Sequence, residues 1–369
     1  MLLLLAGVSA VSADGTGPFS AQIELPGADI WMYQHGGDGG TRTSASTFTA
    51  LPSPATSTHA EDRFAQFVLR FDTASLIHKE YGADNYLPEK VVMTAVLLQG
   101  GLVYDPTEDA RQTYLPSGAA GAVADTDAGR PIELFGTGFR SGATEATFNE
   151  ESEYGSGAIH GRSAYAMSYS STGVARDVSH NVTEGIDSTP WAVGRVLVRA
   201  GDGETYEELA PGAIIPELAH VEFELNLTIP GVAAYVRQAL DKGRIWFTVS
   251  SLHSTTEMAS SGYPSFYTKE NAEQAEFGDV AAFLQVDYSL PVRVISFSRD
   301  AVAGTAAISW NGSKGFKYEL QRSEELTGES WLPVTTITPN ANGAVSWSGA
   351  SASPRAFYRV LRTPAPPTP

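Results

Sequence analysis

The sequence of 369 residues contains no cysteine and has few basic residues. Without cysteine the chain cannot form disulfides, zinc–thiolate sites, iron–sulfur clusters or a cysteine nucleophile. Its 24 Lys and Arg stand against 42 Asp and Glu, which gives a formal net charge of −18. A surface with this charge repels phosphate backbones and anionic lipids. We therefore expect no nucleic-acid partner, whereas a polysaccharide or a component of the cell surface or matrix fits the charge better.

Several catalytic motifs are also missing. The sequence has no Gly-x-Ser-x-Gly nucleophile elbow, no His-x-x-x-His pair on a predicted helix and no glycine-rich phosphate loop after a strand. Zinc hydrolysis, nucleotide chemistry and a serine triad on that motif therefore have no support. We predict that the chain has no catalytic residues and is not an enzyme.

The only long apolar run lies at the N-terminus. Residues 1–13 read MLLLLAGVSAVSA, and Val11 and Ala13 have the spacing of a signal-peptidase site. This run is too short to span a bilayer, so we expect no membrane insertion. It predicts a signal peptide and a secreted or cell-surface protein. Because export without disulfides suits a bacterial protein of this size, we expect a bacterial source.

Alternation with period two dominates the rest of the chain and predicts an all-β fold. Phe67, Leu69 and Phe71 lie on one face of a predicted strand, and Val68 and Arg70 on the other. Further strands are predicted at 91–98, 164–170, 192–198, 220–227, 244–251 and 281–288. Residues 230–243 are the exception, because their apolar side chains recur at helical spacing between a proline and a glycine. The pattern favours antiparallel β-sandwiches with one short helix.

The length and a change of rhythm indicate two domains. A single hydrophobic core stops growing at roughly 250–300 residues, so 369 residues exceed one core. We place the larger sandwich at 14–290, a smaller one at 291–362 and a proline-rich tail at 363–369. The smaller unit has the size of an immunoglobulin-like sandwich.

Several stretches, taken in order, resemble the DNRLRE-type modules of secreted bacterial proteins. These are DIWMY (29–33), RFAQFVLRFD (63–72), VVMTAVLL (91–98), FELNLTIPGVAAYV (223–236) and GRIWFTVSSLH (243–253). The resemblance implies a jelly-roll-like β-sandwich of the carbohydrate-binding-module kind, some members of which bind polysaccharides. The chain departs from that pattern in GGDGG (36–40) and in a long insertion at 105–189. The segments ISW (308–310), YELQRS (318–323) and FYRV (357–360) resemble fibronectin-type modules.

Aromatic residues are the candidate glycan contacts. Trp31, Tyr33 and His35 lie on one face of a predicted strand, where aromatic faces can stack against sugar rings. Trp191 follows a proline at the end of a loop, and Trp246 lies opposite an apolar strand face. The alternative is that these rings are buried, because large aromatic side chains are mostly part of a core.

Acidic loops are candidates for a structural calcium ion, the only cofactor we consider. Asp125 and Asp127 form one such pair, and Asp202 stands in a Gly-Asp-Gly turn. Calcium binds six to eight oxygen atoms, which such loops can supply. None of the loops has EF-hand spacing, and solvated acidic loops without an ion are the alternative.

The sequence therefore predicts a secreted, non-catalytic carbohydrate-binding or surface-adhesion protein. One alternative is a structural subunit of an extracellular layer or filament. Another is a polysaccharide lyase or glycoside hydrolase, for which His160, Arg162, Tyr165 and Tyr169 form the best group. The oligomeric state does not follow from the sequence.

Overall fold

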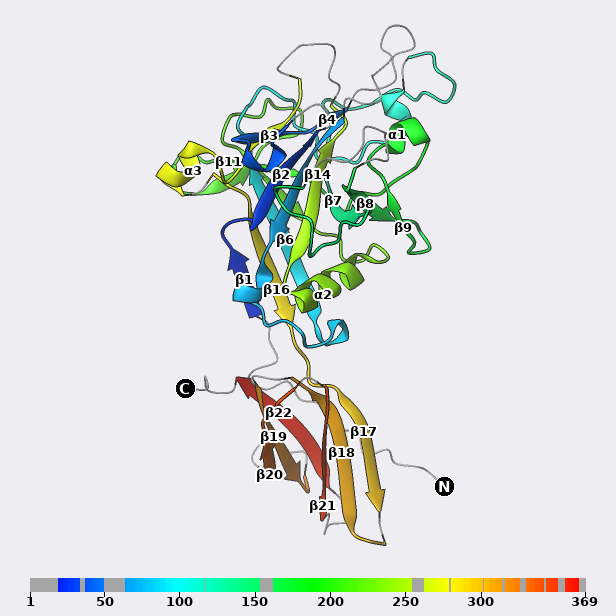
Figure 1. Ribbon diagram of the computed structural model, residues 1–369, viewed down its shortest axis with the longest axis vertical. Helices are drawn as coiled ribbons and strands as arrows, with labels where there is room; N and C mark the ends of the chain where they lie inside the picture. Colours follow the sequence, from blue (N-terminus) through cyan, green and yellow to red (C-terminus); the bar gives the residue numbers. More distant parts are fainter. Residues whose placement is uncertain are drawn as a thin grey trace.

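The structure is a computed structural model, shown in Figure 1. It describes residues 19–33, 37–49, 64–115, 117–152, 162–253, 262–278, 280–300, 302–313, 316–325, 330–341, 343–350 and 356–364. Within them the protein is all-β and built from antiparallel sheets, which confirms the predicted fold class and is compatible with a β-sandwich. The predicted signal peptide lies outside the described residues.

Two large sheets form the N-terminal part. The first has six strands, in the order β1 (Phe19–Ile23), β16 (Phe283–Ser289), β6 (Leu87–Val96), β13 (His220–Glu224), β11 (Arg195–Arg199) and β12 (Tyr206–Glu208). The second runs β2 (Ala28–Tyr33), β5 (Phe64–Phe71), β14 (Ile245–Ser251), β7 (Ile132–Phe139), β8 (Ala164–Tyr169) and β9 (Ala175–Asp177). Added to it are β4 (Phe48–Thr49) on β5 and β10 (Ala192–Val193) on β7. A small pair, β3 (Ser44–Ser46) with β15 (Ser265–Tyr267), lies beside them.

The main core lies between the two large sheets. Phe67, Leu69 and Phe71 of β5 are fully buried in it, as the alternation predicts. From the first sheet, Met93 of β6 and Phe223 of β13 belong to the same core. Because side chains alternate between the faces of a strand, these three residues of β5 point into the same space.

The outer face of the second sheet is covered as well. Val68, expected on an exposed face, is fully buried in a second apolar cluster with Ile30, Met32 and Trp246. Phe148, from the long loop after β7, closes this cluster. The sheet is therefore buried on both faces, and long loops form an outer layer over it.

The predicted helix is present as α2 (Val232–Lys242). Its buried side chains include Val232, Val236 and Leu240, which recur at the predicted spacing, and Gly243 ends it in the left-handed conformation with φ 77°. Two shorter helices, α1 (Asn181–Glu184) and α3 (Ala272–Phe277), lie in loops. Short 3₁₀ turns occupy Gly39–Thr41, Thr73–Ser75, Ala83–Asn85 and Arg111–Tyr114. In the described part of the chain, no helix has the length and apolar character of a membrane span.

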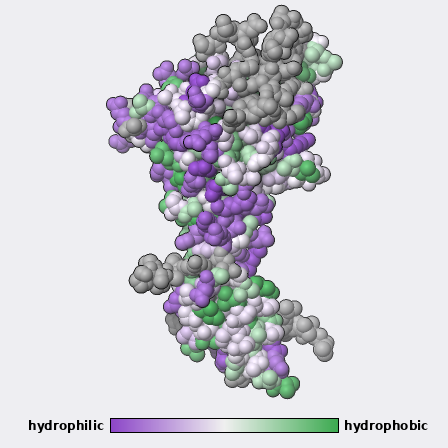
Figure 2. All heavy atoms as spheres, in the orientation of Figure 1, coloured by the Kyte–Doolittle hydropathy of each residue, from purple (hydrophilic) through white to green (hydrophobic). Residues whose placement is uncertain are grey.

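The C-terminal part forms two three-stranded sheets. One is β17 (Val294–Asp300), β18 (Thr305–Gly312) and β21 (Gly343–Ala350), and the other is β20 (Leu332–Ile337), β19 (Phe316–Ser323) and β22 (Phe357–Pro364). Trp310 and Tyr318 are buried between them, with ring centroids 6.3 Å apart. Figure 1 shows this part as a separate lobe, and on the face in Figure 2 the larger lobe is the more hydrophilic.

The two lobes are in contact at one end. The ring of Phe316 lies 5.7 Å from that of His78 and 5.4 Å from that of Tyr81, measured between centroids. The side-chain amide of Asn311 donates a hydrogen bond to Asn85 at 2.8 Å. An aromatic contact and a polar contact therefore connect the smaller lobe to the larger one.

Gly136, in the middle of β7, lets a large ring approach the backbone. A Cβ atom at this position would lie 2.1 Å from the Trp191 ring, which is fully buried. The backbone N–H of Trp191 also donates to the carbonyl oxygen of Leu134 at 2.8 Å. Glycine is thus required here by close packing and not by its backbone dihedrals.

We expect Gly136→Ala to lower the free energy of unfolding by about 1–3 kcal/mol, because the Trp191 ring must move to make room. Urea denaturation measures the change. Gly201→Ala is the control, since nothing lies within 4 Å of a Cβ atom there. Adding Trp191→Phe should recover part of the loss, because the smaller ring relieves the clash. Wild-type stability in Gly136→Ala would contradict this account of the packing.

Candidate functional site

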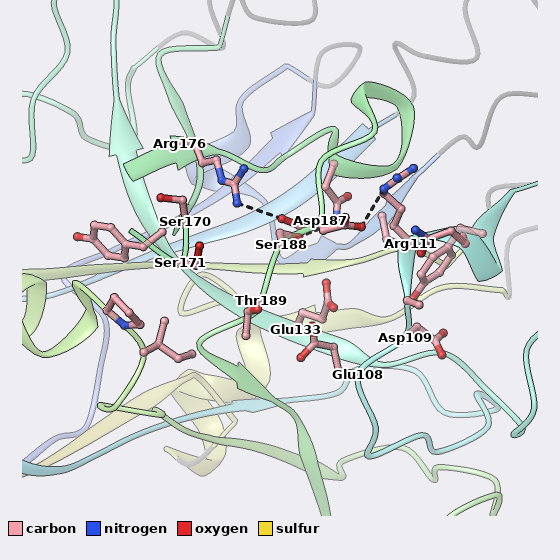
Figure 3. Close-up of a pocket in the computed structure, with 18 residues that line it drawn as sticks. Glu108, Asp109, Arg111, Glu133, Ser170, Ser171, Arg176, Asp187, Ser188 and Thr189 are labelled. Carbon is pink, nitrogen blue, oxygen red and sulfur yellow. Dashed lines mark hydrogen bonds and ion pairs between the residues drawn. The ribbon is translucent and has the colours of Figure 1, made fainter. Parts of the chain in front are cut away.

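A polar pocket of about 490 Å³ lies against the second sheet, under the long loops. Its wall comes from residues 108–114 of the loop before β7, the segment 169–189, and Ile229 and Pro230 before α2, together with Glu133 of β7 and Leu252 after β14. Carboxyl, guanidinium and hydroxyl groups line it, as Figure 3 shows: Glu108, Asp109, Arg111, Glu133, Ser170, Ser171, Arg176, Asp187, Ser188 and Thr189.

Glu133 places a buried carboxyl group in this pocket. Its neighbours Ile132 and Leu134 belong to the main core, so the alternation of β7 turns Glu133 to the outer face. Only 6% of the residue is exposed. Burial, with repulsion from Glu108 and Asp109, raises the pKa of Glu133 to about 8. The group is therefore largely uncharged at neutral pH and can both donate and accept hydrogen bonds.

Two arginines and one aspartate form the opposite wall. The Nε atom of Arg111 donates to the Asp187 carboxylate at 3.0 Å. Arg176 donates to the backbone carbonyl of Asp187 at 3.2 Å, and Figure 3 shows the two arginines reaching it from different sides. Nearby, the amide of Asn181 donates to the Ser188 hydroxyl at 2.9 Å. This wall is held by the protein's own hydrogen bonds.

Other pocket groups have no protein partner. Among the described residues, the side chains of Glu108, Glu133, Ser171 and Thr189 form no hydrogen bond with another protein group. Glu133 is the buried one of these four side chains, so solvent or a ligand in the pocket must complete its hydrogen bonds, whereas Glu108, Ser171 and Thr189 are exposed to solvent. The pocket therefore combines side chains that are free to bind a ligand with a wall of Arg111, Arg176 and Asp187 that is fixed by hydrogen bonds within the protein.

Trp191 supports this pocket from behind instead of lining it. The ring is fully buried and stacks on Tyr169, with centroids 5.9 Å apart and planes 7° apart. Tyr169 is half-buried and lines the pocket. The expectation that Trp191 offers its ring to a glycan is corrected, because its faces are occupied by Tyr169, Tyr235 and Gly136.

The predicted aromatic row of Trp31, Tyr33 and His35 begins with a side chain, Trp31, that faces the interior. Trp31 pairs with Phe67 of β5 and so lies on the core side of the sheet. Its indole N–H donates to the Ser46 carbonyl at 2.9 Å, and the Arg42 guanidinium lies 5.1 Å from the ring centroid. Tyr33 is tilted by 38° to Trp31, so the two rings form no flat platform. Their edges line a separate pocket, and His35 lies outside the described residues.

Trp246 is also buried. Only 1% of it is exposed, it lies among Phe139 and Phe148, and its indole N–H donates to the Glu145 carbonyl at 3.0 Å. No face is free for a sugar. The reason is the covered outer face of the sheet, which a prediction from strand alternation alone leaves open to solvent.

The predicted calcium residues have different environments. Asp202 uses both carboxylate oxygens to hold its own turn, accepting from the N–H groups of Glu204 and Thr205 and from the Thr205 hydroxyl. Those hydrogen bonds lower the pKa of Asp202 to about 2. Asp125 pairs with Arg130 at 2.7 Å. Asp127, in contrast, lies in a cluster of three aspartates.

That cluster consists of Asp105, Asp109 and Asp127, which each place one carboxylate oxygen within 4.8 Å of the others. A second cluster is formed by Asp29, Glu150 and Glu270. The second cluster already contains a cation, because the Lys269 ammonium forms ion pairs with all three carboxylates. The two clusters therefore differ in how far their charge is neutralised.

The group suggested for a lyase is not assembled as that chemistry requires. Arg162 is fully buried and donates to Gln66 at 2.8 Å, on the interior of the outer layer. Tyr165 lies under the Arg140 guanidinium, 4.4 Å from it. Tyr169 belongs to the polar pocket, and His160 lies outside the described residues.

Comparison with known proteins gives no match: no protein-family model, curated protein or solved structure is significantly similar to this chain. The DNRLRE-type and fibronectin-type resemblances accordingly remain predictions.

Sequence reasoning missed Glu133, Glu108, Arg111 and Arg176. One signal was present for the first of these, since a charged residue between Ile132 and Leu134 is unusual in a strand that is buried on both faces. The others lie in loops, and no local pattern shows that those loops meet.

The buried carboxyl group predicts a pH effect on stability. Because the pKa of Glu133 rises from 4.5 to about 8 on folding, the folded chain binds one more proton between these values. The free energy of unfolding should then fall as pH rises through this window. Glu133→Gln should remove the Glu133 part of that slope, while Asp29, whose pKa burial raises to about 7, keeps its own part. The variant should be more stable than the wild type at pH 8, by an amount of the order of a few kcal/mol.

Urea denaturation at pH 5 and pH 8 checks this. Glu224→Gln, at an exposed position on β13, is the matched control and should keep the wild-type slope. Equal pH slopes in Glu133→Gln and the wild type would show that Glu133 does not titrate as described.

Proposed function

We propose that this chain is a secreted carbohydrate-binding protein without catalytic activity, and that the polar pocket beside Glu133 is its binding site. Support comes above all from a buried carboxyl group, Glu133, that has no protein hydrogen-bond partner and faces a pocket lined with hydroxyl, carboxyl and guanidinium groups. Sugars carry many hydroxyl groups that both donate and accept, which suits such a lining. Tyr169 adds an aromatic surface for the apolar face of a sugar ring.

The charge of the lining favours a neutral glycan. Four carboxyl groups, from Glu108, Asp109, Glu133 and Asp187, stand against the two guanidinium groups of Arg111 and Arg176. Even with Glu133 protonated, the lining itself carries no excess of positive charge, and Asp109, its unbalanced carboxylate, pairs with Arg130 outside the lining. An acidic polysaccharide would gain no net attraction from this pocket and would be repelled by a chain with a net charge of −18.

The test is affinity electrophoresis on a panel of neutral and acidic polysaccharides. We expect retardation on at least one neutral polysaccharide. Arg176→Ala should weaken binding by about tenfold or more, because it removes a charged donor from the pocket. Arg176 is exposed, so the fold should survive. Arg195→Ala, which removes an exposed arginine of β11 far from this lining, is the control.

Tyr33→Ala separates this pocket from the aromatic row predicted from the sequence. Unchanged binding in Tyr33→Ala together with weakened binding in Arg176→Ala agrees with the proposal. The opposite pattern would move the site to the row at Trp31 and Tyr33. No retardation on any polysaccharide would contradict carbohydrate binding itself.

Glycoside hydrolysis is the second candidate function, and Glu133 is the observation that favours it. A glycosidase needs one protonated and one ionised carboxyl group across the scissile bond. The high pKa of Glu133 fits the role of the acid, and Glu108, whose pKa burial raises as well, supplies a second carboxyl group in the same pocket.

Reducing-end release from any polysaccharide that binds decides between the two functions. For the binding protein we expect no release above background. Release that Glu133→Gln abolishes while binding persists would establish the hydrolase. Glu224→Gln serves again as the control for a general effect of losing one carboxylate.

A further inference from the structure

We propose that Asp105, Asp109 and Asp127 hold a calcium ion. The three carboxylates come from two segments, 105–109 before β7 and the loop at 125–127, so an ion there would join them. One oxygen of each lies within 4.8 Å of the others. Two oxygens on opposite sides of a calcium ion, at about 2.4 Å from it, are separated by about that distance.

One carboxylate oxygen of the cluster is buried without a partner. Asp105 is only 4% exposed, and its Oδ2 atom accepts no hydrogen bond. Its Oδ1 atom is satisfied by the N–H and hydroxyl groups of Thr107, at 2.9 and 2.7 Å. A buried carboxylate oxygen without a donor is costly unless a cation or water completes it. Asp105 therefore indicates a missing positive charge at this place.

The surrounding residues neutralise the cluster only in part. Arg130 pairs with Asp109 at 2.6 Å and with Asp125 at 2.7 Å. Among the described residues, no lysine or arginine forms an ion pair with Asp105 or Asp127. Four carboxylates against one guanidinium leave an excess of three negative charges. Burial, together with repulsion from Asp127 and Asp109, raises the pKa of Asp105, as expected for a carboxylate that lacks a countercharge.

The local backbone is arranged to bring the two segments together. The Thr107 hydroxyl donates to Asp127 at 3.0 Å as well as to Asp105, so it already connects both segments. Gly129 has φ 109°, and a Cβ atom there would lie 2.7 Å from the Val103 carbonyl and 3.0 Å from the Asp105 Cβ atom. Only glycine allows this approach. The close approach of Gly129 to residues 103 and 105 thus keeps the loop that carries Asp127 beside Asp105.

Calcium fits this group better than magnesium or a transition metal. All the donors are hard oxygens, and no histidine belongs to the cluster. Carboxylates spread over two loops with irregular spacing suit the flexible coordination of calcium, whereas magnesium demands a compact octahedron. The cluster of Asp29, Glu150 and Glu270 is less suitable, because Lys269 already provides its cation.

The test is titration of chelator-treated full-length protein with CaCl₂, followed by calorimetry and thermal unfolding. We expect one site with a Kd on the order of 10⁻⁴ to 10⁻³ M or tighter, the range of extracellular modules, and a Tm that rises with calcium. Asp127→Asn should weaken binding by about tenfold or more, since it removes one charged ligand. Asp127 is exposed, so this variant should fold even if Asp105→Asn does not.

Asp202→Asn is the matched control, since it makes the same change in an acidic loop whose carboxylate serves its own turn. It should bind calcium like the wild type. Absence of any heat or Tm change at millimolar CaCl₂ would overturn the proposal. Wild-type affinity in Asp127→Asn would also overturn it, and MgCl₂ binding as tightly as CaCl₂ would overturn the assignment to calcium.

Discussion

The contact between the Trp191 ring and the backbone of Gly136 is the constraint on which the outer layer of the structure depends. The same residue is fixed through its main chain, because its N–H donates to Leu134 and its carbonyl accepts from Asn226. Trp191 thus ties the end of the segment 170–190 to β7 at two points and to Asn226, after β13, at a third. With that end fixed, Asp187 and Ser188 are held over β7, and a pocket forms between loop and strand instead of a loop free in solvent.

The strands of the central sheets could be predicted because they alternate strictly. β13, β14 and β16 each begin within two residues of the start of the predicted range, and the amphipathic spacing of α2 was equally clear. β7 was missed because Gly136 and Gly138 interrupt its apolar pattern. Those glycines are there for packing, since the rings of Trp191 and Tyr165 lie against them. The feature that hid the strand is therefore the feature that builds the site.

The aromatic residues proposed as glycan contacts show what strand alternation cannot predict, namely whether a strand face is covered. Alternation assigns Trp246 to the face opposite Phe247, which is correct, but it cannot say that Phe148 and Phe139 cover that face. Such coverage comes from a loop about 100 residues away in sequence, and no local pattern encodes it. Whether Trp31 is exposed or buried stayed open for a related reason, because the pairing of β2 with β5 that turns it inward is a long-range contact.

The loop before β7 contributes to two sites that differ in charge, the polar pocket beside Glu133 and the aspartate cluster. Asp109 belongs to both, since it lines the polar pocket and also stands in the aspartate cluster. On the pocket side, burial favours the neutral form of Glu133, which suits hydrogen bonding to an uncharged ligand. On the cluster side, Asp127 is exposed and three carboxyl groups stand close together, which suits a cation. A calcium ion on the cluster would offset the negative charge of Asp109, and would thereby weaken one of the two repulsions that add to burial in raising the pKa of Glu133. The two sites would then be linked through a single carboxylate, with metal occupancy lowering the pKa of the group at the floor of the pocket.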